Sequence, residues 1–371
     1  MGRDTVPIAA WIAPVFLLRF SRTAPRRYLA LGGLALGLAW LFQFRGMMPA
    51  PNWIVLASAL PTGLLGFLPY AVDRWLHPRA AGFTSTLIFP CAMAGWGFLM
   101  GLFSPYGSWC SYGYSQYGNL PLMQVSAVTG LYGISFLVTW LGSAANWAWE
   151  HGFDWRRIRR GAVIFLGVQA IVCLGGNARL LLDRPQAGYA RVAGIAGEGS
   201  NRLLARSEIE AKAGAQLVFW REGATDVSRS DEPALIQKGA DLARRNHIFL
   251  GMALISNEAG QDHADLVIAP ANDWEAIDPW HTQMAVFRAV ENGFNLVRDV
   301  GHGRSIATDY MGRSLAETDN VIKANQTIVA YVPTHGVRTI YGAIGDLFAW
   351  ICIGAIVPLA LSGRSAVKPP V

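Results

Sequence analysis

One glutamate stands where a general base could act. Glu222 follows the apolar run 216–220 in the sequence LVFWREGA, so it lies just past the carboxyl end of an expected strand. Partial burial beside Trp220 would raise the pKa of its carboxyl group and suit it to take a proton from a nucleophile. The alternative is a solvated loop acid that pairs with Arg221 or another arginine.

A second set of polar residues lies within the stretch 264–313. An Asn272-Asp273-Trp274 corner follows a short apolar run, and His281 lies in the first turn of the helix expected next. A helix beside strands, with a polar corner before it, can form the wall of an active site. The same pattern also fits an ordinary α/β layer, in which His281 is a hydrogen-bonded packing residue.

Local signals fix the elements of this stretch. We expect Asp278 to be the N-cap of the helix, Pro279 its first residue and Gly293 the residue that ends it. Two strands, 294–299 and 305–309, are then expected to form a hairpin.

Two further groups of residues in this stretch are considered for a structural or a catalytic role. Arg288 lies three residues before Glu291, and this spacing predicts an ion pair within the helix. Ser305, His302 and Asp299 are the residue types of a serine triad, but no nucleophile elbow is present.

The elements that must position these residues follow the pattern of an α/β domain. Strands are expected at 191–196, 216–220 and 248–255, with helices at 203–213 and 233–245 between them. Strands that alternate with helices predict a sheet covered by helices, with a site at the carboxyl ends of the strands.

Composition places the rest of the chain in a membrane. Of the 371 residues, 52% are hydrophobic and 15% charged, and the mean hydropathy is +0.28. No Asp, Glu, Lys or Arg occurs from Ala81 to Trp149. These values exclude an ordinary soluble protein. The four cysteines show no C-x-x-C spacing, so a zinc or redox motif is not expected.

The apolar segments predict about six membrane spans. They are 28–44, 53–70, 83–103, 125–147, 161–182 and 340–361, with 6–20 as a shorter candidate. We therefore expect a transmembrane region at 1–188, a soluble domain at 189–336, and a last transmembrane helix with a short tail at 337–371.

Arginines in alternate short loops predict the orientation. Every second loop between the expected spans is basic, and so is the tail after the last span. These segments contain Arg22, Arg26, Arg27, Arg74, Arg79, Arg156, Arg157, Arg159, Arg160, Arg364 and Lys368. With these loops cytoplasmic, the soluble domain is expected on the extracytoplasmic side. The same placement argues against nucleic acid as a partner, although the net charge is +6.

Four segments resemble one known family. They read GYSQYGNLPLMQVSAVTGLYGISFLV, WREGA, PANDW…H…FRAVENGFNLVR…S…D..GR and TIYGAIGDLFAW. They are similar, in this order, to the apolipoprotein N-acyltransferases, the membrane members of the nitrilase (carbon–nitrogen hydrolase) superfamily. The resemblance implies a multi-span α-helical membrane bundle plus an α/β nitrilase-like domain, an αββα sandwich, in a bacterial-type inner membrane.

The resemblance also implies a reaction. In this family a cysteine takes a fatty acyl chain from a phospholipid and passes it to the amino group of a lipoprotein's N-terminal cysteine. The triad is Glu-Lys-Cys, and Glu222 matches the general base. The family's lysine and cysteine lie between that glutamate and the Asn-Asp-Trp corner. Here residues 221–271 hold Lys238 alone and no cysteine, so the triad Lys and Cys are not found and the domain is expected to be shortened.

A shortened domain has two expected consequences. Loss of triad members removes most of the rate of an acyl-enzyme reaction, so catalysis is expected to be impaired. Loss of strands from the middle of a sheet leaves edges open, which predicts a covering partner, a rearranged sheet or marginal stability.

Three functions stay open from the sequence. The first is an acyltransferase-like protein with impaired catalysis, the second a non-catalytic lipid- or lipoprotein-binding scaffold, and the third a membrane-anchored amidase with another nucleophile. Expected partners are membrane phospholipid and a lipoprotein N-terminus; no cofactor or metal is expected. Besides Glu222, the residues expected to form the site wall or bind are Trp220, Asn272, Asp273, Trp274, His281, Glu291 and Ser305.

Overall fold

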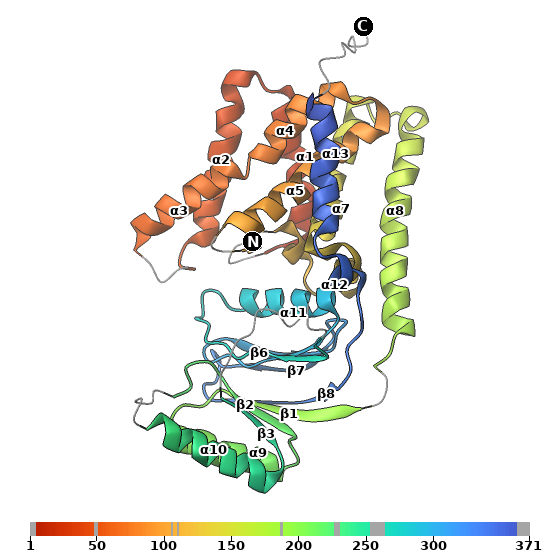
Figure 1. Cartoon of the computed structure of the whole chain (residues 1–371). Helices are drawn as coiled ribbons and strands as arrows, with labels where there is room; N and C mark the ends of the chain where they lie inside the picture. The colour runs from red at the N-terminus through yellow and green to blue at the C-terminus, as the bar shows by residue number, and fades with distance from the viewer. Residues whose placement is uncertain are drawn as a thin grey trace. The chain divides into compact units, whose positions relative to one another are not determined.

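The computed structural model describes residues 5–47, 51–104, 107–109, 111–185, 188–225, 231–252 and 264–361 (Figure 1). The chain divides into two compact units. The helical unit comprises Met1–Arg179 and Ile344–Val371, and the α/β unit comprises Leu180–Ala343. Domain limits at residues 188 and 336 stay a prediction.

The helical unit is built from apolar helices. Its elements are α1 (Pro7–Thr23), η1 (Arg26–Tyr28), α2 (Leu29–Phe44), α3 (Asn52–Leu65), α4 (Leu68–Leu76), η2 (His77–Arg79), η3 (Gly82–Leu87), α5 (Ile88–Phe103), η4 (Tyr112–Gln116), α6 (Leu120–Met123), α7 (Ser126–Glu150), α8 (Trp155–Leu182) and α13 (Leu347–Leu361). A short helix, α12 (Ile340–Ile344), precedes α13.

Four helical stretches of the described ranges are long and apolar enough to cross a membrane. They are Asn52–Arg79, Gly82–Phe103, Ser126–Glu150 and Trp155–Leu182. The expected spans 28–44 and 340–361 correspond to shorter helices, α2 with 16 residues and α13 with 15.

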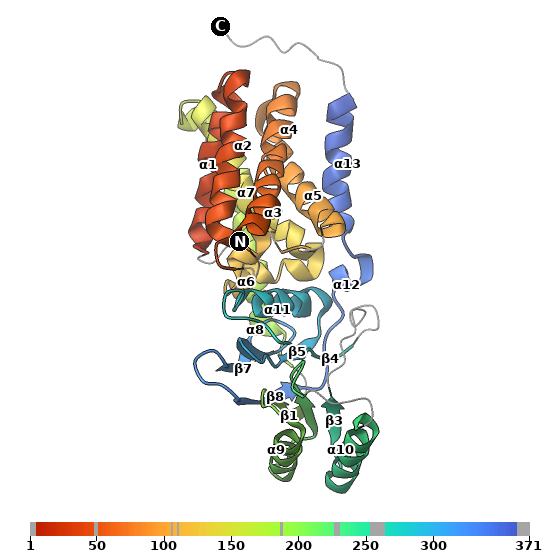
Figure 2. The same cartoon turned by 90° about the vertical axis from the view of Figure 1, so that its left-hand side faces the viewer.

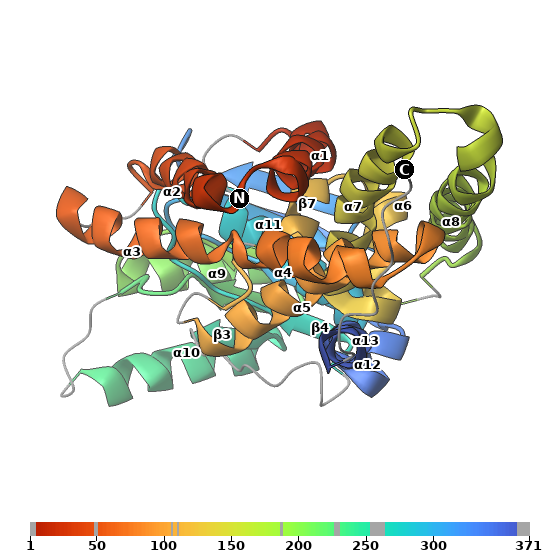
Figure 3. The same ribbon diagram turned by 90° about the horizontal axis from the view of Figure 1, so that it is seen from above.

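The helices of this unit differ in how much of their surface they bury. Within the apolar window of α7, 72% of the residues are buried, whereas 17% are buried in that of α8. Figures 1 and 3 show α8 standing apart from the other long helices of the unit. Helix α7 is therefore the central helix of the bundle, and α8 leaves most of its apolar surface for lipid.

Glycines allow a close approach of α2 and α3. A Cβ atom on Gly63 of α3 would lie 2.6 Å from the Cα atom of Gly37 of α2, which is closer than real Cβ contacts. Small residues at such crossings let two backbones touch, as is usual between membrane helices.

The α/β unit contains two four-stranded sheets. Sheet A has the order β3-β2-β1-β8 and sheet B the order β4-β5-β6-β7. Their strands are β1 (Tyr189–Ile195), β2 (Leu217–Trp220), β3 (Phe249–Met252), β4 (Leu266–Ile268), β5 (Asn295–Arg298), β6 (Arg304–Thr308), β7 (Ser314–Asp319) and β8 (Thr327–Pro333). Strands β1, β2 and β3 pair in parallel, as do β4 and β5, whereas β8 and the pairs β5–β6 and β6–β7 are antiparallel.

The two sheets face each other and carry helices on their outer faces. Val192 and Phe219 of sheet A pack in one cluster with Val297 and Ala307 of sheet B. Helices α9 (Ser200–Lys212) and α10 (Glu232–Asn246) cover the other face of sheet A, and α11 (Trp280–Asn292) covers sheet B (Figure 2). The layers are thus helix, sheet, sheet, helix, the order expected for an αββα sandwich.

The two strands on either side of residues 253–263 lie at sheet edges. Among the described strands, β3 ends sheet A and β4 ends sheet B. Residues 253–263 connect them, so the last part of the strand expected at 248–255 lies outside the described residues. Because the junction is at two edges, the inner strands of both sheets keep their partners.

The start of α11 differs from the expected one. The helix begins at Trp280, and Pro279 occupies the cap position without a capping hydrogen bond. Asp278 does not cap the helix, because its Oδ1 atom accepts a hydrogen bond of 2.6 Å from the backbone N–H of Arg304. The end is as predicted: Gly293 has φ of +79° and follows the last helical residue.

Candidate functional site

Arg221, the residue before Glu222, fills the interior at the end of β2. It is 3% exposed. Its Nε atom donates to the carbonyl of Ala196 at 3.1 Å, Nη1 to the carbonyl of Glu222 at 3.0 Å, and Nη2 to the carboxylate of Glu198 at 2.8 Å. The guanidinium group therefore ties the chain after β1 to the chain after β2.

Glu222 is exposed, and the expected partial burial is wrong. The reason is that the neighbouring arginine occupies the buried position and holds the backbone of Glu222 by its carbonyl. The Glu222 side chain is thus presented to solvent from a fixed backbone, at the carboxyl end of a central strand.

The corner after β4 is joined to the turn between β5 and β6. The N–H of Ala271 donates to the carbonyl of Asp299 at 2.8 Å, and the N–H of Gly301 donates to the carbonyl of Ala271 at 3.0 Å. The side chains of Asn272 and His302 meet at 2.9 Å, between Oδ1 and Nδ1.

Gly301 brings this corner against Arg221. A Cβ atom at Gly301 would lie 2.6 Å from Nη1 of Arg221 and 2.6 Å from Oδ1 of Asn272. A Cβ atom at Gly223 would lie 3.8 Å from Nδ2 of the same asparagine. Residues from three separate segments therefore meet, and we refer to Arg221, Glu222, Asn272, Gly301 and His302 as the strand-end cluster.

Asp273 locks the corner to the helix and to β5. Its Oδ1 atom lies 2.9 Å from Nδ1 of His281, and its Oδ2 atom accepts from Nη2 of Arg298 at 2.7 Å. Arg298 also donates from Nε to the hydroxyl of Thr282 at 3.2 Å. Burial alone would raise the pKa of Asp273, but the hydrogen bond from His281 and the charge of Arg298 outweigh it and lower the pKa.

The other expected wall residues separate into two groups. Trp274 is 39% exposed, and its ring lies 6.4 Å from that of His281 in an edge contact. Glu291 is fully buried and forms the predicted ion pair with Arg288 at 2.6 Å, so its contacts hold α11.

Trp220 does not line the strand-end cluster. Its indole N–H donates to the hydroxyl of Ser207 on α9 at 2.9 Å, and its ring packs in the cluster between sheet A and the helices. Successive strand residues point to opposite faces, and its neighbour Phe219 faces the other sheet.

Ser305 and Asp299 lie together in the interior between the sheets. The Ser305 hydroxyl donates to Oδ1 of Asp299 at 3.1 Å and accepts from the N–H of Val300 at 2.9 Å, and both side chains are fully buried. His302 contacts Asn272. The geometry of a serine triad is therefore not formed.

The environment of Asp299 makes it a titrating group near neutral pH. Burial raises the pKa of Asp299 to about 7, against the hydrogen bond from Ser305 and the charge of Arg221. Its Oδ2 atom has no hydrogen-bond partner among the described residues.

No lysine or thiol of the α/β unit is placed to complete a triad. The sequence from 180 to 343 contains no cysteine and three lysines, Lys212, Lys238 and Lys323. All three lysine side chains are exposed, and Lys238 lies within α10 rather than at a strand end. Of the four cysteines, Cys91, Cys173 and Cys352 belong to helices of the helical unit, and Cys110 lies outside the described residues.

Two residues of the cluster were not singled out from the sequence. The sequence suggests Arg221 only as a partner for Glu222, although a charged residue at the end of an apolar strand is a signal of a buried cation. Gly301 lies between the two strands of the expected hairpin, and only its contact with Arg221 and Asn272 shows why a glycine is needed there.

Comparison with known proteins gives one family-model match and matches to two relatives. Residues 5–144 match the family model of the apolipoprotein N-acyltransferase N-terminal domain. An apolipoprotein N-acyltransferase of Geobacter metallireducens is 28% identical over 268 residues, which cover 63% of this chain and 50% of that protein. Apolipoprotein N-acyltransferase 1 of Treponema denticola is 30% identical over 146 residues, 36% of this chain and 24% of that protein. The chain thus spans about half or less of the curated relatives it matches, and the resemblance is confirmed.

Proposed function

We propose that this chain, which resembles the apolipoprotein N-acyltransferases, is an integral membrane protein of acyl-lipid chemistry with an impaired acyl-transfer reaction. The reaction of the family would carry an acyl group from a phospholipid to a lipoprotein amino group. The proposal rests on one observation: Glu222 stands exposed in an ordered strand-end cluster, while the α/β unit contains no cysteine and no buried lysine.

The chemistry explains why this combination impairs catalysis. Glu222 can take a proton from a nucleophile, but a thioester needs a thiol to attack the phospholipid ester. A cation or N–H donor must also stabilise the oxyanion that forms during the attack. With the glutamate alone, the first half of a ping-pong reaction has no nucleophile to acylate.

The location is part of the proposal. Apolar helices and the confirmed resemblance support a membrane protein. We place it as a multi-pass protein of a bacterial-type inner membrane with the nitrilase-like α/β unit on the extracytoplasmic side. A reporter fused after Gly336 that appears in the cytoplasm would overturn this orientation.

Acyl transfer is tested directly by mass. Purified protein is incubated with phospholipid and a diacylated lipoprotein peptide, and a triacylated peptide is sought by mass spectrometry. The proposal expects no product, or product more than about 1,000-fold slower than from a relative with the complete triad. Product at the relative's rate that is lost on Glu222→Gln, and kept on Glu275→Gln as the control for an exposed acid of the same unit, would overturn it.

A binding protein is the second candidate, because the corner is intact without its catalytic partners. Asn272, Asp273 and His281 are held by hydrogen bonds that do not involve a nucleophile. Retention of the diacylated peptide without turnover, reduced by Trp274→Ala, would favour it.

A membrane-anchored amidase with Ser305 as nucleophile is opposed by the structure. The Ser305 side chain is fully buried, and its hydroxyl is engaged with Asp299 and Val300. Hydrolysis of an amide substrate that Ser305→Ala abolishes would restore this candidate.

A further inference from the structure

One end of the helical unit gathers the positive charge of the chain. Residues 19–27, 73–79 and 149–160 contain ten arginines and three acids, a net charge of +7, against +6 for the whole protein. The arginines are Arg19, Arg22, Arg26, Arg27, Arg74, Arg79, Arg156, Arg157, Arg159 and Arg160, and the acids are Asp73, Glu150 and Asp154. We refer to these three segments as the basic end.

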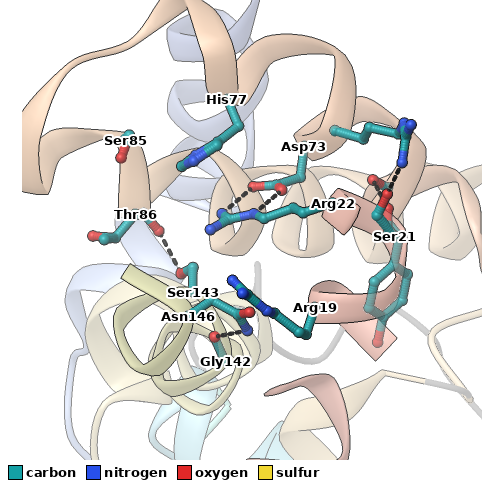
Figure 4. A network of polar contacts seen from close by, with 12 residues as sticks. Arg19, Ser21, Arg22, Asp73, His77, Ser85, Thr86, Gly142, Ser143 and Asn146 are labelled. Carbon is teal, nitrogen blue, oxygen red and sulfur yellow. Dashed lines mark hydrogen bonds and ion pairs between the residues drawn. The ribbon is translucent and has the colours of Figure 1, made fainter. Parts of the chain in front are cut away.

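Hydrogen bonds join the segments of the basic end. Arg22 of α1 donates from Nε and Nη2 to both oxygens of Asp73 of α4, at 2.8 and 2.9 Å, and from Nη1 to Glu150 of α7 at 3.2 Å. Glu150 also lies 3.4 Å from Nε2 of His77 in η2. Figure 4 shows Arg22 aimed at Asp73, with His77 on one side and Arg19 of the same helix on the other. Three helix ends thus form one polar surface.

Two arginines at this surface lie over indole rings. The Cζ atom of Arg79 is 4.1 Å from the ring centroid of Trp75, and that of Arg19 is 5.1 Å from the ring centroid of Trp149. Trp75 is 53% exposed and Trp149 is 43% exposed. Exposed indoles beside arginines are typical of the level of lipid headgroups.

Neither of these arginines is neutralised within the described residues. Two carboxylates of the basic end, Asp73 and Glu150, are occupied by Arg22 and His77. Neither Arg19 nor Arg79 has a carboxylate within 4 Å in the described ranges. The positive charges of Arg19 and Arg79 are therefore available to bind an anion from outside the protein.

Two nitrogen atoms of η2 are buried without a partner. Nη1 of Arg79 and Nδ1 of His77 have no hydrogen-bond partner in the part of the chain that the structure describes. The Nη1 atom of Arg79 always carries hydrogens, and a buried N–H without an acceptor costs free energy, so a site that supplies an oxygen to Arg79 is favoured. The Nδ1 atom of His77 donates only when it carries a proton. A phosphate offers such oxygens together with negative charge.

We propose that the basic end binds the phosphate of an anionic phospholipid, with Arg19 and Arg79 as charged ligands and Trp75 and Trp149 at headgroup level. A lipid rather than free phosphate is indicated by the exposed indoles and by the apolar helices that end here. An anionic headgroup rather than a zwitterionic one is indicated by the two positive charges of Arg19 and Arg79, neither of which has a carboxylate within 4 Å in the described ranges. The site shares no residue with the strand-end cluster, so it holds whether or not the protein transfers acyl groups.

Lipid binding by the purified full chain tests the proposal. Delipidated protein is titrated with phosphatidylglycerol or phosphatidylcholine of identical acyl chains at about 0.15 M salt, and bound lipid is counted by native mass spectrometry. The expected result is a preference for phosphatidylglycerol of about ten-fold or more, since two charge-assisted contacts are involved. The double variant Arg19→Gln/Arg79→Gln is expected to lose this preference.

A matched variant separates a site from general attraction. Arg156→Gln/Arg159→Gln removes the same charge from exposed positions of the same end, and is expected to change the preference less than about two-fold. Equal losses in both double variants, equal binding of the two lipids, or displacement by millimolar inorganic phosphate would each overturn the proposal. If Arg19→Gln/Arg79→Gln does not fold, Arg79→Lys takes its place, because lysine keeps the charge and lacks the planar fork; an unchanged lipid preference in it would count against Arg79 as a ligand.

Discussion

The hydroxyl of Ser305 donates a hydrogen bond across 3.1 Å to the carboxylate of Asp299, deep between the two sheets of the α/β unit. Arg221, which holds the backbone of Glu222, is the charged group that acts on this carboxylate. The interior of the unit therefore contains an acid whose protonation changes the charge beside the strand-end cluster.

Asp299 makes the stability of the α/β unit fall as pH rises. Its pKa is about 7 in the folded chain and about 4 when unfolded, so between these values the folded state holds the extra proton. The free energy of unfolding should decrease from about pH 4 to pH 7 and then level off. Asp299→Asn should lose this slope and be more stable than the wild type at pH 8, by an amount on the order of 1.4 kcal/mol per pKa unit. Denaturant unfolding at several pH values measures this, and Asp241→Asn, at an exposed acid, should keep the slope.

The lock around Asp273 should be costly to break. Asp273→Asn removes the counter-charge of Arg298, whose side chain is 10% exposed, and is expected to cost about 3 kcal/mol. Asp241→Asn removes an exposed ion pair with Arg244 and should cost less than about 1 kcal/mol. Because the pKa of Asp273 is lowered, its contribution should be complete above about pH 4 and disappear below the folded pKa. An equal loss of unfolding free energy in Asp273→Asn and Asp241→Asn would show that the contacts of Asp273 stabilise the fold no more than an exposed ion pair does.

Gly301 should not tolerate a side chain. Gly301→Ala places a Cβ atom 2.6 Å from both Arg221 and Asn272, and the movement it forces is expected to cost about 1–3 kcal/mol. At Gly197 the nearest atoms would be 3.7 Å from a Cβ, so Gly197→Ala should change stability little. Thermal unfolding of the two variants side by side gives the comparison. If Gly197→Ala lowered the unfolding temperature more than Gly301→Ala, the packing around Gly301 would be contradicted.

The Arg22–Asp73 pair should behave as one unit. Its side chains are 5% and 0% exposed, so Arg22→Met or Asp73→Leu alone leaves a buried charge and is expected to cost about 3–5 kcal/mol. The double variant should cost clearly less than the sum of the two. Thermal unfolding in detergent of the wild type, the two single variants and the double variant measures the coupling between the two side chains. Additive costs would show that the two side chains do not depend on each other.

Many elements of the α/β unit were predictable from local sequence patterns, whereas β7 and β8 were not among the expected strands. Gly293 ends α11 as expected, and the hairpin of β5 and β6 forms where its residues predict. Helix ends and hairpins depend on residues that are close together in the sequence, so they can be predicted from it.

The orientation of single side chains was not predictable, since it depends on residues far away in the chain. Asp278 fails to cap its helix because the N–H of Arg304 takes its carboxylate. In the pair Arg221-Glu222 the sequence does not say which side chain is buried, and Ala196 and Glu198, some 25 positions earlier, decide it. Phe219 and Trp220 are both apolar, so alternation alone does not assign their faces.

Among the described strands, β3 and β4 each terminate a sheet, and the chain passes from one to the other between Met252 and Ala264. Length can change at such a junction without shifting the register of any inner strand, and the entropy of a longer connection grows only slowly. This junction is therefore a place where the length of the chain can differ between proteins of this fold while the inner strands keep their pairing.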